Sequence, residues 1–176
     1  DYLVIDFPPG TSDEPLTVAQ SLPDIDGMVI VTTPQQVALL DSRKSITFSE
    51  SLKVPVLGVV ENMSGFTVNG TAAPGTEVNI AAPGGKTLSA TADAEGHFSV
   101  VLDIFKEGGG KETAEEFGVP FLGALPFDPG FVRGGDDGVH RIVSEPDGAS
   151  AKAFASVVAA IQAQLSDGAD GGLEIV

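Results

Sequence analysis

The chain has 176 residues, 42% of them hydrophobic, which is enough for one globular domain with or without a small insertion. Its 25 acidic residues against 9 Lys and Arg give a net charge of −16, and a surface this negative repels nucleic acid and anionic membranes. We expect no membrane-spanning segment and no signal peptide. The absence of cysteine excludes disulfides and the usual all-cysteine iron–sulfur site.

The charge balance also bears on the environment of the protein. An acidic surface around a core of ordinary hydrophobic content predicts adaptation to high salt, where ions screen the repulsion between carboxylates. We therefore expect a cytoplasmic protein of a halophilic prokaryote. An acidic protein from an ordinary cytoplasm is the alternative.

The first thirteen residues combine an apolar run with a sharp stop. Tyr2–Ile5 is apolar and partly β-branched, as in a strand buried on both faces of a parallel sheet. Asp6 ends the run, and Pro8-Pro9-Gly10 prevents the strand from continuing. Ligands bind outside the carboxyl ends of parallel strands, where an Asp commonly holds Mg²⁺ against phosphates. The alternative for Asp6 is a carboxylate that caps the next turn.

Alternating strand and helix patterns follow along the chain. Short apolar runs that predict buried strands end at polar or proline-containing loops, and the longer segments between them carry the apolar stripe of a helix. We expect strands at Met28–Val31, Val54–Val60 and Gly118–Leu125, and helices at Glu14–Leu22, Gln35–Leu52 and Ala149–Leu165. Repeated strand–loop–helix units predict an α/β fold with a parallel sheet and helical crossovers.

Three strings in these units resemble the Mrp/ApbC family of iron–sulfur cluster carrier ATPases, which are related to MinD and ParA. The first, DYLVIDFPPGTSD at Asp1–Asp13, is similar to the Walker B region of the family, with Ser12 in place of a glycine. The second is TTPQQVALLDSRK at Thr32–Lys44, and the third is ENMSGF at Glu61–Phe66. The family has a nucleotide site at the carboxyl edge of its sheet, and the resemblance implies one here.

The roles that the resemblance implies fall on two halves of that site. On the adenine side, an amide suits the edge of the base because it offers both a donor and an acceptor. The resemblance places Asn62 and Pro126 against the adenine. On the phosphate side it implies that Asp6 holds Mg²⁺ and that Asp6 and Asp13 are the catalytic carboxylates. Pro9, Gly10 and Thr11, together with Asp13, would form the switch that senses the γ-phosphate. The alternative for Asn62 is a turn residue after a strand.

The sequence departs from the family pattern in two respects. A P-loop ATPase needs a glycine-rich phosphate cradle with its Lys, and the G-x-x-x-x-G-K-[ST] spacing occurs nowhere in the chain. The glycine-rich Lys106–Lys111 follows no buried strand and has no Ser or Thr after its last Lys, so we interpret it as the lead-in to a helix. The Cys-Pro-x-Cys segment that holds the family's bridging cluster is also missing. We expect a partial P-loop NTPase fold that lacks the P-loop strand.

A β-rich insertion, Thr67–Leu102, stands where the family has that cysteine segment. Its apolar residues recur with period two, Val78 with Ile80 and Phe98 with Val100, between turn-forming Pro-Gly and Asp-Ala-Glu-Gly sequences. This pattern predicts a small β-meander of three strands, and it resembles part of a bacterial Ig-like repeat. The predicted parts are a Mrp-like body at 1–66 and 103–165, the insertion at 67–102 and an acidic flexible tail at 166–176.

Two classes of function follow. The first is a part of an iron–sulfur cluster carrier ATPase that binds Mg-ATP and passes clusters to apo-proteins, as a homodimer or with a missing N-terminal half. Such a part would be inactive by itself because the Walker A loop and the cluster-binding cysteines are absent. The second is a non-catalytic binding or scaffold protein in which the α/β body presents the β insertion. Whether the chain is an enzyme stays open at this point.

Overall fold

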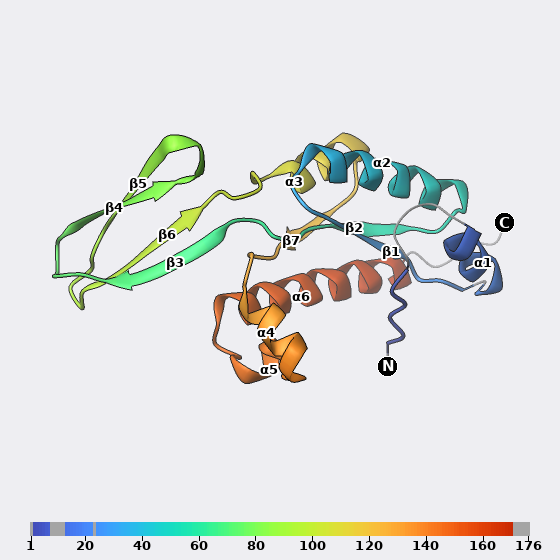
Figure 1. Ribbon diagram of the computed structural model, residues 1–176. Helices are drawn as coiled ribbons and strands as arrows, with labels where there is room; N and C mark the ends of the chain where they lie inside the picture. Colours follow the sequence, from blue (N-terminus) through green and yellow to red (C-terminus); the bar gives the residue numbers. More distant parts are fainter. Residues whose placement is uncertain (1, 8–12, 23, 171–176) are drawn as a thin grey trace.

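The computed structural model describes residues 2–7, 13–22 and 24–170. It consists of an α/β body and a β arm, Phe66–Leu102, which projects from one end of the body (Figure 1). No helix among these described residues is long and apolar enough to cross a membrane.

The body is built on a parallel sheet of three strands in the described part of the chain. These are β1 (Met28–Thr32), β2 (Val56–Glu61) and β7 (Phe121–Ala124), in the spatial order β1-β2-β7. Val59 in the central strand faces Ile30 on one side and Phe121 on the other. The parallel sheet with helical crossovers confirms the predicted α/β class.

Helices cover both faces of the sheet. On one face lie α2 (Gln36–Ser51) and α3 (Gly109–Phe117), and on the other lies α6 (Ala149–Asp170) (Figure 1). Successive residues of β2 point to opposite faces, so both faces need apolar side chains and β2 is apolar throughout until Glu61. The core towards α2 and α3 contains Ile30, Ile46, Val59 and Ala114, and the core towards α6 contains Val60, Leu122, Leu125 and Val157.

Three short helices complete the body. α1 (Asp13–Ser21) precedes β1, and α4 (Gly130–Asp137) with α5 (Arg141–Ser144) connects β7 to α6. The helices predicted at Glu14–Leu22 and Gln35–Leu52 are confirmed to within one residue at each end. Residues 166–170, which the sequence assigned to a flexible tail, continue α6 as helix. The rest of that tail, 171–176, lies outside the described residues.

The predicted first strand, Tyr2–Ile5, does not form. The segment carries no regular structure and is exposed, at 69% for Tyr2, 82% for Leu3 and 88% for Val4. A strand buried on both faces needs a neighbouring strand and two covering layers, and nothing in the described residues supplies them. The outer edge of β1 is also unpaired there, and Val31 on that strand is 60% exposed. The predicted strand is therefore wrong. The run is apolar, but no described strand lies beside it.

The β arm contains four strands rather than the three expected. They are β3 (Phe66–Thr71), β4 (Glu77–Ala82), β5 (Lys86–Thr91) and β6 (His97–Leu102), with the short 3₁₀ turn η1 (Pro83–Gly85) between the middle two. In a meander each strand pairs with the next one along the chain. Here β3 pairs with β6, and β4 pairs with β5 inside it. The arm is therefore one long hairpin and not a meander.

The two ladders of the hairpin share a single register. Phe66 faces Leu102 at the base, Thr71 faces His97, and Glu77 faces Thr91 after an equal number of residues on each side. The hairpin bends at a corner between the ladders, where Ala72 N–H donates to Gly96 O (2.9 Å). The arm therefore leaves and re-enters the body at adjacent positions.

One face of each ladder is apolar. Along β4 the side chains alternate between exposed and half-buried, and Val78 and Ile80 share the half-buried face as predicted. On the β3–β6 ladder Phe98 lies over Gly70, which has no side chain, and a Cβ at Gly70 would collide with the ring. An aromatic ring over a strand glycine restores the packing that the glycine lacks.

Candidate functional site

The candidate site lies at the carboxyl edge of the sheet, where the loops after β2 and β7 run side by side. Leu125 N–H donates to Glu61 O (2.7 Å), Ser64 N–H to Leu125 O (2.9 Å) and Phe127 N–H to Gly65 O (2.8 Å). These bonds extend the parallel pairing of β2 and β7 beyond the strands themselves. They place Asn62 and Pro126, the two residues predicted to line the adenine, on neighbouring loops.

Asn62 forms a turn and keeps part of its amide available. Its backbone N–H donates to Thr32 O at the end of β1 (2.7 Å), and its Oδ1 accepts the N–H of Met63 (2.9 Å). Met63 has φ of 56°, a left-handed conformation that is uncommon for a side chain of this size. Nδ2 of Asn62 has no hydrogen bond to any described residue. Asn62 thus takes part in a local turn after β2, and its side-chain N–H₂ group has no partner among the described residues.

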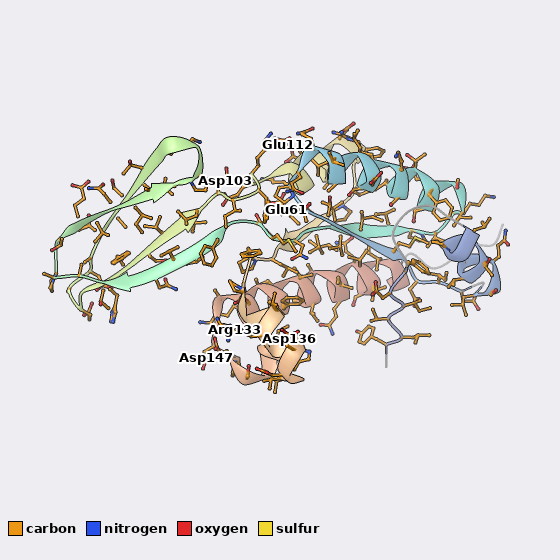
Figure 2. All side chains as sticks on the ribbon, viewed as in Figure 1. Glu61, Asp103, Glu112, Arg133, Asp136 and Asp147 are labelled. Carbon is orange, nitrogen blue, oxygen red and sulfur yellow. The ribbon has the colours of Figure 1, made fainter. Side chains whose placement is uncertain are left out.

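Glu61, the last residue of β2, is a buried carboxylate with a complete set of donors. Its side chain is 1% exposed. Oε1 accepts Ser64 Oγ–H (2.5 Å) and Gly108 N–H (3.0 Å), and Oε2 accepts Gly110 N–H (2.7 Å). Figure 2 shows Glu61 at the junction of the sheet, the start of α3 and the base of the β arm. Sequence analysis assigned no role to it.

The same contacts explain why the glycine-rich stretch is not a phosphate loop. Gly108 and Gly110 lie at the amino end of α3, where unpaired N–H groups and the helix dipole attract an anion. That anion is the carboxylate of Glu61. A Cβ at Gly110 would lie 3.0 Å from Glu61 Cβ, so the backbone approaches too closely for a side chain. The predicted helix lead-in is confirmed, because α3 begins at Gly109.

A second carboxylate, Asp128, organises the loop after Pro126. It accepts hydrogen bonds from Gly130 N–H (2.7 Å), Arg141 Nε (3.0 Å) and Ser150 Oγ (2.7 Å), which tie α4, α5 and α6 together. Burial raises the pKa of Asp128, but the bonds from Ser150, Gly130 and Arg141 outweigh it and hold that pKa below its usual value. Hydrogen bonds to Asp128 and Glu145 in turn raise the pKa of Arg141.

A cavity of about 290 Å³ opens next to this cluster, between the base of the β arm and the body. The arm contributes the start of β3, the body contributes the loop after β7, and the amino end of α6 closes the third side. The polar lining residues include Asn69, Asp128, Arg141, Glu145 and Ser150. The aromatic wall is formed by Phe66 and Phe127, whose rings meet edge to face with centroids 5.8 Å apart.

Of the residues predicted for the phosphate side, only Asp6 and Asp13 are described, and neither lies at the end of a strand. Asp6 lies on the exposed segment 2–7 and not at the end of a strand. Asp13 is the first residue of α1. Pro9, Gly10 and Thr11 lie outside the described residues.

The fit of Mg²⁺ and ATP follows from these positions. Within 2–7, 13–22 and 24–170, no three His, Cys, Asp or Glu side chains gather where they could hold a metal ion. The sequence has no Gly-rich loop with the P-loop Lys and no cysteine. The residues that the structure describes therefore do not fit the phosphates and metal of Mg-ATP, and the sequence offers an iron–sulfur cluster no thiolate.

A parallel α/β sheet with loops gathered at its carboxyl edge places the chain in the general class of α/β proteins that bind ligands at that edge. The ParA model described as "NUBPL iron-transfer P-loop NTPase" matches residues 1–97 and 94–162. The chain belongs to this family of iron-transfer P-loop NTPases.

The relatives carry names consistent with that family. An iron–sulfur cluster carrier protein of Methanocaldococcus jannaschii is 41% identical over 143 residues, which are 81% of this chain and 40% of that protein. A cytosolic Fe-S cluster assembly factor NUBP2 homolog of Nematostella vectensis is 42% identical over 140 residues, 78% of this chain and 42% of its own length. The chain thus spans less than half the length of these relatives.

Among solved structures, a nucleotide-binding protein of Archaeoglobus fulgidus in complex with ADP is similar to this chain. It is 33% identical, and the match covers 76% of this chain and 43% of that one with a TM-score of 0.47.

Sequence reasoning proposed Asn62 and Pro126 as site residues but did not single out the two carboxylates that hold their loops. Glu61 ends an apolar run, and Asp128 stands in the Pro-Phe-Asp-Pro string, so both positions gave a signal. The sequence gives no sign of the partners of Glu61, because Gly108 and Gly110 are 47 and 49 residues away from it. Such contacts depend on the tertiary fold.

Proposed function

We propose that this chain forms the adenine-binding side of an iron–sulfur cluster carrier ATPase of the Mrp type. The observation that carries the proposal is the pairing of the loops after β2 and β7, which puts Asn62 and Pro126 on neighbouring loops at the carboxyl edge of a parallel sheet. The Asn62 amide keeps a free donor, and Pro126 offers an apolar surface to a base. Membership of the iron-transfer NTPase family supports the same assignment.

This chain would supply only part of the phosphate and metal side of the site. By resemblance, Asp6 would organise Mg²⁺ and Pro9 to Asp13 would sense the γ-phosphate. The sequence lacks the phosphate loop that would supply the backbone N–H cradle and the Lys, and one Asp does not replace that loop. We therefore propose that the chain alone neither hydrolyses ATP nor holds a cluster. A polypeptide that carries the P-loop would complete the site, with or without a second copy of this chain as partner, and iron–sulfur apo-proteins would be the recipients.

The setting of this activity is also a proposal. Two relatives are named as cytosolic assembly factors, which supports a cytoplasmic location. The net charge of −16 supports work at high salt and disfavours nucleic acid and anionic membranes as partners.

Nucleotide binding tests the adenine side. Equilibrium titration with fluorescent ADP and GDP analogues should show weak binding that prefers ADP, and Asn62→Ala should remove the preference. Asn79→Ala is the matched control, because Asn79 is an exposed amide on β4 that bonds only Ser89 Oγ (2.6 Å). Equal binding of the two analogues to the unmodified chain would contradict the proposal.

Assays of ATP hydrolysis and of cluster binding test whether the chain has a working phosphate site or cluster site. Phosphate release with Mg-ATP should stay at the level of a no-protein blank, and anaerobic reconstitution with iron and sulfide should leave no absorbing cluster after desalting. A turnover that Asp6→Ala abolishes would show that the chain forms a working phosphate site. A stoichiometric cluster would show ligands other than thiolates.

A scaffold function is the second candidate. It is favoured by the β arm, which stands clear of the body as one long hairpin (Figure 1). The two candidates differ in what Asn62→Ala does: it weakens adenine recognition in the first and changes nothing in the second.

A further inference from the structure

Glu61 stands apart among the charged residues of the protein. In the described part of the chain it is the one charged side chain that is fully buried, at 1% exposure. Taking a carboxylate out of water is costly unless donors replace the water, and here three donors do so. If the position required only packing, an apolar side chain would fill it without that cost. The carboxylate therefore serves its three partners.

Those partners come from two separate segments. Ser64 belongs to the loop that carries Asn62, while Gly108 and Gly110 form the start of α3, at the point where the chain returns from the β arm. The backbone O of Glu61 also accepts Leu125 N–H (2.7 Å), in the loop that carries Pro126. One residue thus joins the two adenine-side loops to the first turn of a helix.

The bond between Glu61 and Ser64 closes a turn around Asn62 and Met63. The carboxylate of Glu61 and the hydroxyl of Ser64 meet at 2.5 Å, so the two residues between them are held at both ends. Met63 inside the turn has φ of 56°. A non-glycine residue in this region costs about 1 kcal/mol or more and persists only where its surroundings hold it. Closure by Glu61 restrains the turn together with the backbone bonds from Asn62 N–H to Thr32 O and from Ser64 N–H to Leu125 O.

We propose that Glu61 is a positioning residue for Asn62. Its buried carboxylate fixes the turn at Asn62 and Met63 against the amino end of α3, and the turn then presents the amide of Asn62 at the carboxyl edge of the sheet. The conformation of the turn follows from the contacts above. The consequence for adenine recognition rests on the proposed nucleotide function.

The test uses the full chain with two variants and one control. Glu61→Gln keeps the shape of the side chain but offers one acceptor oxygen in place of two and places an NH₂ group against backbone N–H donors. Ser64→Ala removes only the hydrogen bond between Ser64 Oγ and Glu61, and it leaves the bonds from Gly108 and Gly110 to Glu61 in place. This variant therefore tests the proposal if Glu61→Gln fails to fold. Ser49→Ala is the control, because Ser49 is 0% exposed on α2 and its hydroxyl contacts Met28 Sδ, away from the loop.

Two-dimensional ¹H–¹⁵N spectra of the free chain report on the turn directly. Both loop variants should move the side-chain amide signals of Asn62 and the backbone signal of Met63, and exchange of the Met63 amide with solvent should become about tenfold faster. The control should leave these signals unchanged even if it lowers stability. Asn62 and Met63 signals that coincide with those of the unmodified chain in Ser64→Ala and in folded Glu61→Gln would overturn the proposal.

Titration with ADP and GDP separates this inference from the proposed function. Loss of one well-placed hydrogen bond should reduce the ADP preference about fivefold in Glu61→Gln and less in Ser64→Ala. An unmodified chain that does not distinguish ADP from GDP would overturn the proposed function. In that case the spectra still decide whether Glu61 positions Asn62.

Discussion

Two Val-Val pairs show how differently the body and the β arm are stabilised. In β2 of the body, Val59 is 0% exposed and Val60 is 3% exposed, because helices cover both faces of the sheet. In β6 of the arm, Val100 is 7% exposed and Val101 is 52% exposed, because only one face of the ladder is covered. The same dipeptide therefore buries two side chains in one region and one in the other. The free energy of unfolding should depend mainly on the body.

The largest effect is expected for Val59→Ala in the body. It removes two methyl groups from a core that also contains Ile46 at 0% exposure, and the transfer and cavity contributions together amount to about 2–3 kcal/mol. Val101→Ala makes the same change in the arm and should alter the free energy of unfolding by less than about 0.5 kcal/mol. Urea unfolding at equilibrium measures both. Equal losses in the two variants would mean that the arm and the body share one core.

A smaller and local effect is expected for Gly70→Val in the arm. The new side chain would displace the ring of Phe98, which lies over Gly70, and overpacking of this kind costs about 1–3 kcal/mol. Amide exchange in β3 and β6 should speed up about tenfold while exchange in β2 stays the same. Gly135→Val is the control, because a Cβ there meets no atom within 4 Å. Faster exchange in β2 as well would show that the two regions unfold together.

The difference between body and arm also explains which features the sequence predicts. Continuous apolar runs such as Val56–Val60 predict strands correctly when helical segments follow to cover both faces. Tyr2–Ile5 has the same composition, yet it is exposed and irregular, because a strand needs a neighbour that pattern alone does not reveal. Period-two alternation likewise predicted the inward face of the arm, at Val78 and Ile80.

The sequence pattern did not predict which strands of the arm pair or which distant residues contact each other. The turn-forming sequences of the arm were recognised, but not its strand pairing. The arm forms a bent hairpin because equal numbers of residues separate the two ladders on both sides of the corner, so that one register continues through it. In the candidate site, Asn62 and Pro126 were proposed from the family resemblance, and their role at the adenine stays a prediction. The carboxylate of Glu61 could not be matched to Gly108 and Gly110, since only the return of the chain from the arm brings them together.

A pH effect is expected at the cluster between arm and body. Because hydrogen bonds hold the pKa of Asp128 below the ordinary value of 3.8, the folded state binds fewer protons there than the unfolded state. The contribution of Asp128 to the free energy of unfolding is fully present at a pH above 3.8, and it is lost as the pH falls through the lowered pKa. Asp128→Asn should remove this part of the pH dependence, as measured by unfolding between neutral and strongly acidic pH.

The matched control for that measurement is Asp136→Asn. Asp136 lies on α4 and is exposed, away from the junction (Figure 2). The acid limb of its unfolding curve should follow that of the unmodified chain. If Asp128→Asn follows it too, the hydrogen bonds to Asp128 do not stabilise the folded state.

The smallest effect on the body is expected from removal of the arm itself. Replacing Thr67–Leu102 with a short Gly-Ser linker joins positions that already lie side by side, because Phe66 faces Leu102 at the base. Closing such a loop changes the free energy only slightly. The aromatic contacts at the junction survive, since Phe105 also meets Phe127 edge to face, with centroids 6.1 Å apart. We expect a cooperative thermal transition within about 5 °C of the original midpoint.

The opposite result would follow if the arm were part of the body's core. The apolar faces of two ladders would then cover the sheet or its loops, and their removal would leave an insoluble or molten product. Phe127→Ala in the intact chain is the informative control, because Phe127 contacts both Phe66 and Phe105. It should lower the midpoint more than removal of the whole arm does, since it opens a cavity in the junction whereas the excision stops just outside it. A midpoint lowered more by the excision than by Phe127→Ala would assign the arm a structural role.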